Sequence, residues 1–134
     1  MKILVPTAGP EAANANADYI ISIAKHLDAE LVVIHILDVA EFGEGREALE
    51  IFDRAGQAAG VRVATYIREG EVVPSIVELA EEMEVSLIIM GASRGRIVAN
   101  WIVTQILSET KIPIVIIPFG VELIIPETEP ADAS

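Results

Sequence analysis

Residues 86–117 read SLIIMGASRGRIVANWIVTQILSETKIPIVII, and this stretch decides the fold. An apolar run at 87–90 breaks into a loop with glycine and arginine, followed by a helix-length segment at 101–110 and a second apolar run at 114–117. Glycines after a strand let backbone N–H groups approach a ligand closely, and a helix start adds partial positive charge, so the loop suits an anion. The loop matches neither the phosphate-binding GxxxxGK[ST] pattern nor the dinucleotide-binding GxGxxG pattern.

The rest of the chain repeats the alternation of strand and helix. Apolar runs predict strands at 2–5, 31–37 and 61–67, and stripes at spacings of three and four predict helices at 11–27, at 46–59 and from Pro74 onward. Strands that alternate with helices form a mostly parallel sheet between two helix layers. Because residues 61–67 alternate apolar and polar side chains, we place that strand at an edge. The prediction is an α/β, Rossmann-like three-layer sandwich with a five-stranded parallel sheet of order 3-2-1-4-5.

In such a sheet, ligands bind beyond the carboxyl ends of the strands, where the winding direction reverses. Here the reversal falls between the first and fourth strands, so the predicted crevice lies between residues 6–9 and residues 90–96. The second of these segments contains Arg94 and Arg96. These arginines are either an anion site or ordinary surface side chains, and the sequence leaves both readings open.

Composition restricts the class of protein. The 134 residues fit one domain, and 9 basic against 21 acidic residues give a net charge of −12. This charge repels nucleic acid and anionic membranes, so we expect neither as a partner. There is no cysteine, and no run approaches the roughly 18 apolar residues of a membrane span. We therefore expect a soluble, cytoplasmic protein.

Few residues suggest catalysis or metal binding. His35 lies inside a predicted buried strand with Asp38 three residues on, but a metal site would need a third ligand, so we predict a hydrogen-bonded core histidine. Thr7 and Ser93 have no histidine and carboxylate partners in any recognisable motif. We expect no catalytic residue and no metal site.

Several motifs together resemble the universal stress protein family, in its small single-domain form. They are the opening KILVPT, then ANADYIISIAKHL followed by AELVVIHILD, then VVPSIVELAEEMEVSLIIMGASRG, and finally VTQILSETKIPIVIIP. The resemblance covers residues 1–118. It implies a Rossmann-like fold, a cytoplasmic homodimer paired through the fifth strand, and a regulatory rather than catalytic role in stress response. In many members ATP or AMP occupies the crevice between the first and fourth strands.

The sequence departs from the nucleotide-binding members of that family at three positions. Ala8 stands where those members have an aspartate that contacts adenosine, and Trp101 and Ile102 replace a glycine and a hydroxyl residue that contact phosphate. The matching positions preserve the crevice more than its contacts. The candidate crevice residues are Pro6, Thr7, Ala8, Ile36, Met90, Gly91, Ala92, Arg94, Gly95, Arg96, Val103 and Thr104.

These departures favour a stress-response regulatory protein that lacks the usual ATP-binding mode and acts through an unidentified protein partner or another small ligand, with no cofactor expected. The alternative is a switch that binds ATP or AMP through a modified glycine and arginine loop. An enzyme acting on a phosphorylated metabolite is a third hypothesis, but no acid, base or metal set supports it.

The end of the chain bears on association. An apolar edge strand needs a cover, and we expect a homodimer through Ile114, Val115, Ile116 and Ile117, with Val121, Leu123 and Ile125 as further candidates. Residues 119–126 either add a sixth strand across this dimer or fold back over their own sheet. Residues 127–134 are rich in proline and acid, which predicts a disordered tail.

Overall fold

The computed structural model describes residues 1–37, 42–91 and 99–118 of the chain. Strands and helices alternate throughout this part. In chain order the elements are β1 (Lys2–Pro6), α1 (Pro10–His26), β2 (Glu30–Leu37), α2 (Phe42–Ala59), β3 (Val63–Glu69), α3 (Val72–Glu82), β4 (Leu87–Gly91), α4 (Ala99–Glu109) and β5 (Ile114–Ile117).

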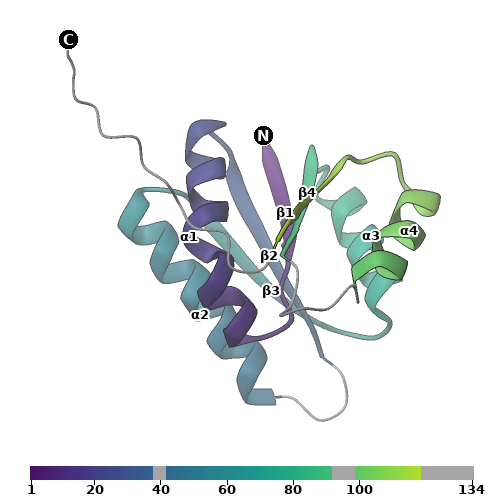
Figure 1. The fold of residues 1–134 in the computed structure, drawn as a ribbon, viewed down its shortest axis with the longest axis horizontal. Coiled ribbons are helices and arrows are strands. Elements are labelled where there is room, and N and C mark those ends of the chain that lie inside the picture. The colour runs from purple at the N-terminus through teal and green to yellow at the C-terminus, as the bar shows by residue number, and fades with distance from the viewer. Residues whose placement is uncertain (38–41, 92–98, 119–134) are drawn as a thin grey trace.

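The five strands form one parallel sheet of order β3-β2-β1-β4-β5, which confirms the predicted fold. The central strand β1 pairs with β2 on one side and β4 on the other. Helices α1 and α2 cover one face of the sheet, and α3 and α4 cover the other (Figure 1). The winding direction therefore reverses between β1 and β4, as the sequence predicts.

Alternate residues of each central strand enter two separate cores. Ile3, Val5 and Val33 point toward α1 and α2, where they pack with Ile20 and Phe52. The residues between them join a second core under α3 and α4, which contains Leu4, Val32, Ile34, Ile76 and Ile106. This double burial explains why the sequence of β2 is almost entirely apolar.

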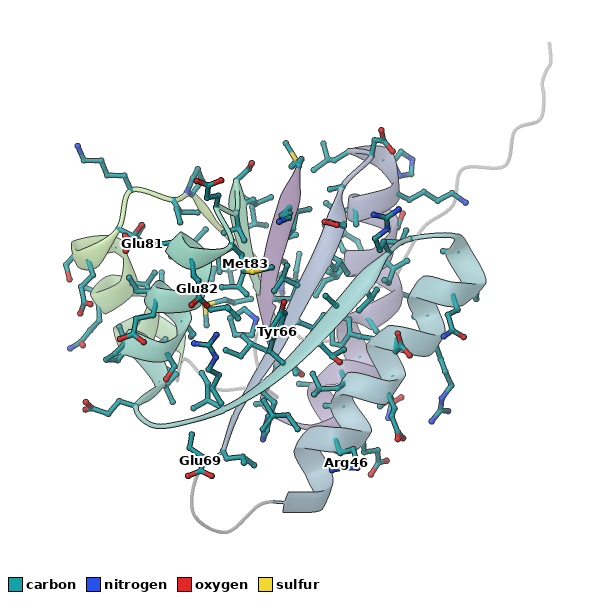
Figure 2. The ribbon with its side chains drawn as sticks, turned by 180° about the vertical axis from the view of Figure 1, so that it is seen from behind. Arg46, Tyr66, Glu69, Glu81, Glu82 and Met83 are labelled. Carbon is teal, nitrogen blue, oxygen red and sulfur yellow. The ribbon has the colours of Figure 1, made fainter. Side chains whose placement is uncertain are left out.

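The edge position of β3 is also confirmed, and its contacts are mainly polar on the α3 side. The Tyr66 hydroxyl donates a hydrogen bond to the Met83 sulfur at 3.9 Å, and Arg68 forms an ion pair with Glu82 at 2.8 Å (Figure 2). On the other face, Ile67 is 42% exposed. The strand thus has a polar, half-buried face toward α3, and on its other face Val63 packs near Gly56 of α2 while Ile67 is exposed.

Several element boundaries differ from the prediction, among them the start of α4 at Ala99 rather than at residue 101. Helix α2 begins at Phe42 rather than at residue 46. The prediction began the helix too late because Gly43 and Gly45, which lie in its first turn, are residues typical of loops. Strand β3 lies two residues further along than predicted. Helix α3 begins at Val72, so Pro74 is its third residue and does not start it. Proline is tolerated there, since the first N–H groups of a helix have no partner within the helix.

None of the helices in the described ranges is long and apolar enough to cross a membrane. The predicted extension at 119–126 and the predicted tail at 127–134 lie outside the described residues.

A buried histidine joins β2 to the loop after β1 and to helix α2. His35 is 2% exposed, and its Nδ1 donates a hydrogen bond to the Thr7 carbonyl at 2.9 Å. The flat face of the ring lies against Gly45, where a β-carbon would overlap the imidazole. His35 is therefore a hydrogen-bonded core residue, as predicted, and it requires glycine at position 45.

We expect Gly45→Ala to lower the free energy of unfolding by about 1–3 kcal/mol, because the added methyl group must displace the ring or the helix. Urea denaturation measures this change. In a His35→Ala background the ring is gone, so the same substitution should cost at least about 0.5 kcal/mol less. An equal loss in both backgrounds would contradict the contact.

Candidate functional site

The candidate site lies at the carboxyl edge of the sheet, where β1 and β4 end side by side. Strand β1 ends at Pro6, and residues 7–9 lead directly into α1. Strand β4 ends at Gly91, which is paired with Ile117 of β5. We call this end of β4 the β4 lip. We call residues 7–9 the first lip of the crevice; within it Thr7 is half-buried and Ala8 is exposed.

The first lip is fixed by two hydrogen bonds to β2. The Thr7 N–H donates to the Ile34 carbonyl at 2.9 Å, and the Thr7 carbonyl accepts from His35. In neutral imidazole this leaves the Nε2 of His35 as an acceptor, and that atom is buried without a hydrogen-bond partner among the described residues. Both polar groups of one loop residue are thus anchored to the neighbouring strand.

Helix α1 contacts the β4 lip at Gly91 through the side chain of Asn16. This side chain is 3% exposed, and its amide occupies the space that a β-carbon at Gly91 would fill. Its Oδ1 has no hydrogen-bond partner within the described part of the chain. We did not predict this residue. Its signal is its place on the buried stripe of α1, beside Ala13, Ala17 and Ile20.

The structure brings some of the predicted crevice residues together and leaves others undescribed. Pro6, Thr7, Ile36, Met90 and Gly91 all lie at the carboxyl ends of neighbouring strands. Ala92, Arg94, Gly95 and Arg96 lie outside the described residues, as does the side chain of Trp101. On α4, Ile102 and Val103 pack at the border of the core under α3, and Thr104 is exposed.

A cavity of about 370 Å³ opens beside Ile36 at this edge. The β3–α3 connection supplies much of its wall, although the sequence analysis did not select that segment. Its described lining is Ile36, Leu37, Gly70, Glu71, Val72, Val73, Pro74, Gln105 and Glu109.

The lining sets the chemistry of this cavity. Aliphatic side chains line it together with two carboxylates and one amide, and none of the described lining residues is cationic. Such a wall accepts a flat or apolar group that carries hydrogen-bond donors, and it repels phosphate.

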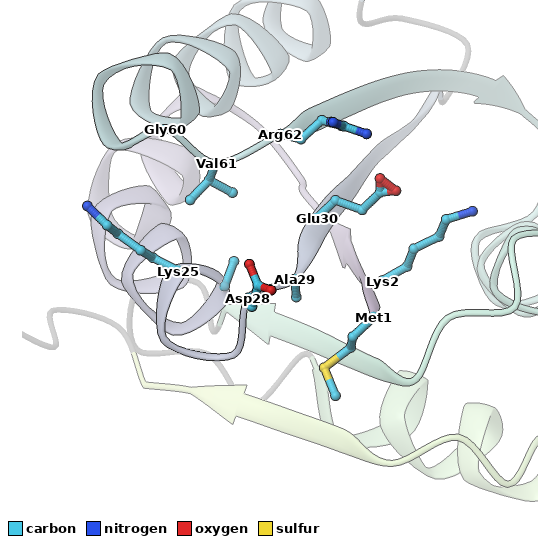
Figure 3. Close-up of a pocket in the computed structure, with 10 residues that line it drawn as sticks. Met1, Lys2, Lys25, Asp28, Ala29, Glu30, Gly60, Val61 and Arg62 are labelled. Carbon is cyan, nitrogen blue, oxygen red and sulfur yellow. The ribbon is translucent and has the colours of Figure 1, made fainter.

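A second cavity, of about 460 Å³, lies at the opposite, amino edge of the sheet (Figure 3). Figure 3 shows the charged ends of Lys2, Glu30 and Arg62 on one side of it and Lys25 on the other. The charges alternate in sign, and none of the predicted crevice residues lines this cavity. It is a separate feature from the candidate site.

No three His, Asp or Glu side chains within residues 1–37, 42–91 and 99–118 are grouped so that they could hold a metal ion. Among the described residues, the polar side chains at the carboxyl edge include the Asn16 amide and the Gln105 and glutamate side chains of the cavity. These groups are suited to binding by hydrogen bonds.

Comparison with known proteins places this geometry in context. The chain is 28% identical to universal stress protein MJ0531 of Methanocaldococcus jannaschii over 137 residues, which cover 87% of this chain and 81% of that protein. Its fold is similar to the crystal structure of a universal stress protein in complex with cAMP, with a TM-score of 0.70, 22% identity, and coverage of 89% of this chain and 97% of that one.

A third similar structure is an Arabidopsis thaliana universal stress protein family protein with AMP bound, with a TM-score of 0.66 and 13% identity over 89% of this chain and 92% of that one. At these identities the two structures support the fold alone. The model of the universal stress protein family matches residues 1–118, and this chain therefore belongs to the universal stress protein family.

Proposed function

We propose that this protein is a non-catalytic, cytoplasmic regulator of stress response that binds an adenine nucleotide with a single phosphate in the carboxyl-edge crevice. The observation that carries this proposal is the cavity beside Ile36, at the carboxyl end of β2, the strand next to β1. The complexes of similar proteins with cAMP and AMP support the choice of ligand. The proposal narrows the alternative given above, a switch that binds ATP or AMP, to a nucleotide with one phosphate.

The cavity suits the base and the sugar. Its aliphatic wall, made by Ile36, Val72, Val73 and Pro74, can cover the face of a purine. The carboxylates of Glu71 and Glu109 and the Gln105 amide can accept hydrogen bonds from an exocyclic amine and from ribose hydroxyls. These acceptors would supply at a new place the hydrogen bonds that the family resemblance assigns to an aspartate at the position of Ala8.

The phosphate belongs at the β4 lip, away from those carboxylates. Gly91 ends β4, Arg94 and Arg96 follow it in the sequence, and α4 begins at Ala99. Backbone N–H groups and a helix start favour an anion. Because Trp101 and Ile102 stand where relatives have a glycine and a hydroxyl residue, and because the chain carries a net charge of −12, we infer one phosphate rather than three.

The second candidate function is regulation without any adenine nucleotide, through a protein partner. Ala8, Trp101 and Ile102 favour it, since each removes a contact that the family resemblance implies. A homodimer through β5 is compatible with either function and stays a prediction.

We expect AMP to bind with a dissociation constant at least about tenfold lower than that of ATP with magnesium, a difference of about 1.4 kcal/mol. Isothermal titration calorimetry measures both constants, and chromatography of the nucleotides afterwards should recover them unchanged. Tighter binding of ATP would contradict the single-phosphate proposal, and no binding of either nucleotide at millimolar concentration would leave the second candidate function.

We expect Ala8→Asp to tighten AMP binding by about tenfold, because a carboxylate in the first lip gains a charge-assisted hydrogen bond to the ligand. Gln57→Glu is the matched control, since it adds the same charge near the exposed end of α2, at the amino edge of the sheet. The control should leave the affinity unchanged. Equal effects of the two substitutions would mean that Ala8 does not face the ligand.

A further inference from the structure

Methionine supplies all the sulfur of this chain, which has no cysteine. Its three methionines differ in exposure. Met1 is 61% exposed, Met83 is half-buried at the C-terminal end of α3, and Met90 is 8% exposed in the core under α3 and α4. Peroxides oxidise a thioether to a sulfoxide, and exposed side chains react most readily. Met1 and Met83 are therefore within reach of an oxidant, whereas Met90 is shielded.

The sulfur of Met83 faces a hydroxyl group on the edge strand. The Tyr66 hydroxyl donates a hydrogen bond to the Met83 Sδ at 3.9 Å (Figure 2). On the same side of the sheet, Arg68 forms an ion pair with Glu82 at 2.8 Å. Two consecutive residues at the end of α3 are thus joined to alternate residues of β3. These two contacts hold the sulfur and the hydroxyl opposite each other.

The separation of 3.9 Å between these two groups fits one added oxygen atom. An S–O bond of about 1.5 Å and an O–H···O hydrogen bond of about 2.7 Å together span it when the angle at the new oxygen is about 135°. Hydrogen bonds reach such an oxygen from its lone-pair directions, over a broad range of angles that includes this one. A thioether sulfur is a weak acceptor, and a sulfoxide is polar. Oxidation would therefore strengthen the contact at its present spacing.

We propose that Met83 is a site of reversible oxidation by hydroperoxides, with the Tyr66 hydroxyl as the donor that binds the sulfoxide oxygen. A sulfur lone pair attacks the terminal peroxide oxygen, and the S–O bond forms as the O–O bond breaks. The proton on the attacked oxygen passes to the departing one, which leaves as water or, from an organic hydroperoxide, as an alcohol. The sulfur loses two electrons and the peroxide gains them. Two external thiols reverse the step, because they become a disulfide and the sulfoxide oxygen leaves as water.

The charge of the chain favours an uncharged oxidant. The net charge of −12 repels anionic oxidants, and Glu81 and Glu82 directly precede Met83 in the sequence. Hydrogen peroxide is small and carries no charge, so this repulsion does not act on it. The proposal is independent of nucleotide binding, since neither Met83 nor Tyr66 is among the described residues that line the cavity beside Ile36.

The configuration of the sulfoxide tests the proposal on the unsubstituted protein. Oxidation makes the sulfur chiral, and each epimer is reduced by its own class of reductase. After treatment with hydrogen peroxide and digestion, stereospecific reduction and mass spectrometry measure each epimer. Because Tyr66 binds an oxygen on one side of the sulfur, one epimer of Met83 should exceed the other by at least about fivefold, a factor that one hydrogen bond of ordinary net strength supplies.

The other methionines are internal controls for this measurement. Met1 should give the two epimers in about equal amounts, and Met90 should be oxidised at least about tenfold more slowly than Met83 because it is shielded. About equal amounts of the two epimers at Met83, or no oxidation of Met83 under conditions that oxidise Met1, would overturn the proposal.

Tyr66→Phe removes the hydroxyl and keeps the ring, so the epimer ratio at Met83 should fall to about one. Tyr19→Phe is the matched control, because the second tyrosine of the chain packs against the core under α1 and α2. It should leave the ratio unchanged, and circular dichroism checks that both variants are folded. A preference that persists in folded Tyr66→Phe would overturn the role of the hydroxyl.

Two further measurements use the unsubstituted protein and so do not depend on the folding of a variant. Oxidation should shift the ring ¹H NMR signals of Tyr66 and leave those of Tyr19 in place. The reductase for the favoured epimer, supplied with a dithiol, should then remove the added oxygen from Met83 in the folded protein. Unchanged Tyr66 signals after complete oxidation of Met83 would contradict the contact, and a sulfoxide that resists the reductase would contradict reversal.

Discussion

The hydrogen bond from the His35 Nδ1 to the Thr7 carbonyl is the constraint on which the candidate site depends. It joins the middle of β2 to the loop that follows β1, and together with the bond from the Thr7 N–H to the Ile34 carbonyl it holds both polar groups of that residue. The same imidazole fills the space above Gly45 of α2. One buried side chain thus fixes the position of the first lip and the approach of a helix, and its Nε2 has no hydrogen-bond partner among the described residues.

The two edges of the sheet differ in their chemistry. At the carboxyl edge, the cavity beside Ile36 has aliphatic walls and acceptor groups, and the segment with Arg94 and Arg96 follows β4 in the sequence. At the amino edge, cationic and acidic side chains alternate around an open depression. In a chain with a net charge of −12, binding of an anion needs local donors close to its charge. The division between an acceptor-lined cavity and the β4 lip favours a ligand that is uncharged at one end and anionic at the other.

The sequence predicts the strand order because it depends on local patterns. Alternation at residues 61–67 indicates an edge strand, and continuous apolar character at 31–37 indicates a buried one. Contacts between distant segments are harder to predict. Gly45 reads as a loop residue because its packing partner, His35, is ten positions earlier and enters only through the fold.

Asn16 was missed for a related reason: on a helix stripe it is one polar residue among alanines, and only the approach of Gly91 gives it a role. The wall formed by residues 70–74 was missed because the predicted crevice lies between β1 and β4, whereas this wall follows the end of β3. Sequence patterns locate an edge of the sheet, whereas the shape of a cavity depends on which loops meet there.

The most direct test of the site is a map of AMP binding by ¹H–¹⁵N NMR on the unsubstituted protein. We predict chemical-shift changes that saturate with AMP and concentrate at the carboxyl edge, on the amides of Thr7, Ile36, Gly70 and Gly91. Shift changes centred on Asp28, Gly60 and Arg62 would place the ligand in the amino-edge cavity and contradict the account, and a spectrum unchanged at millimolar AMP would contradict nucleotide binding itself.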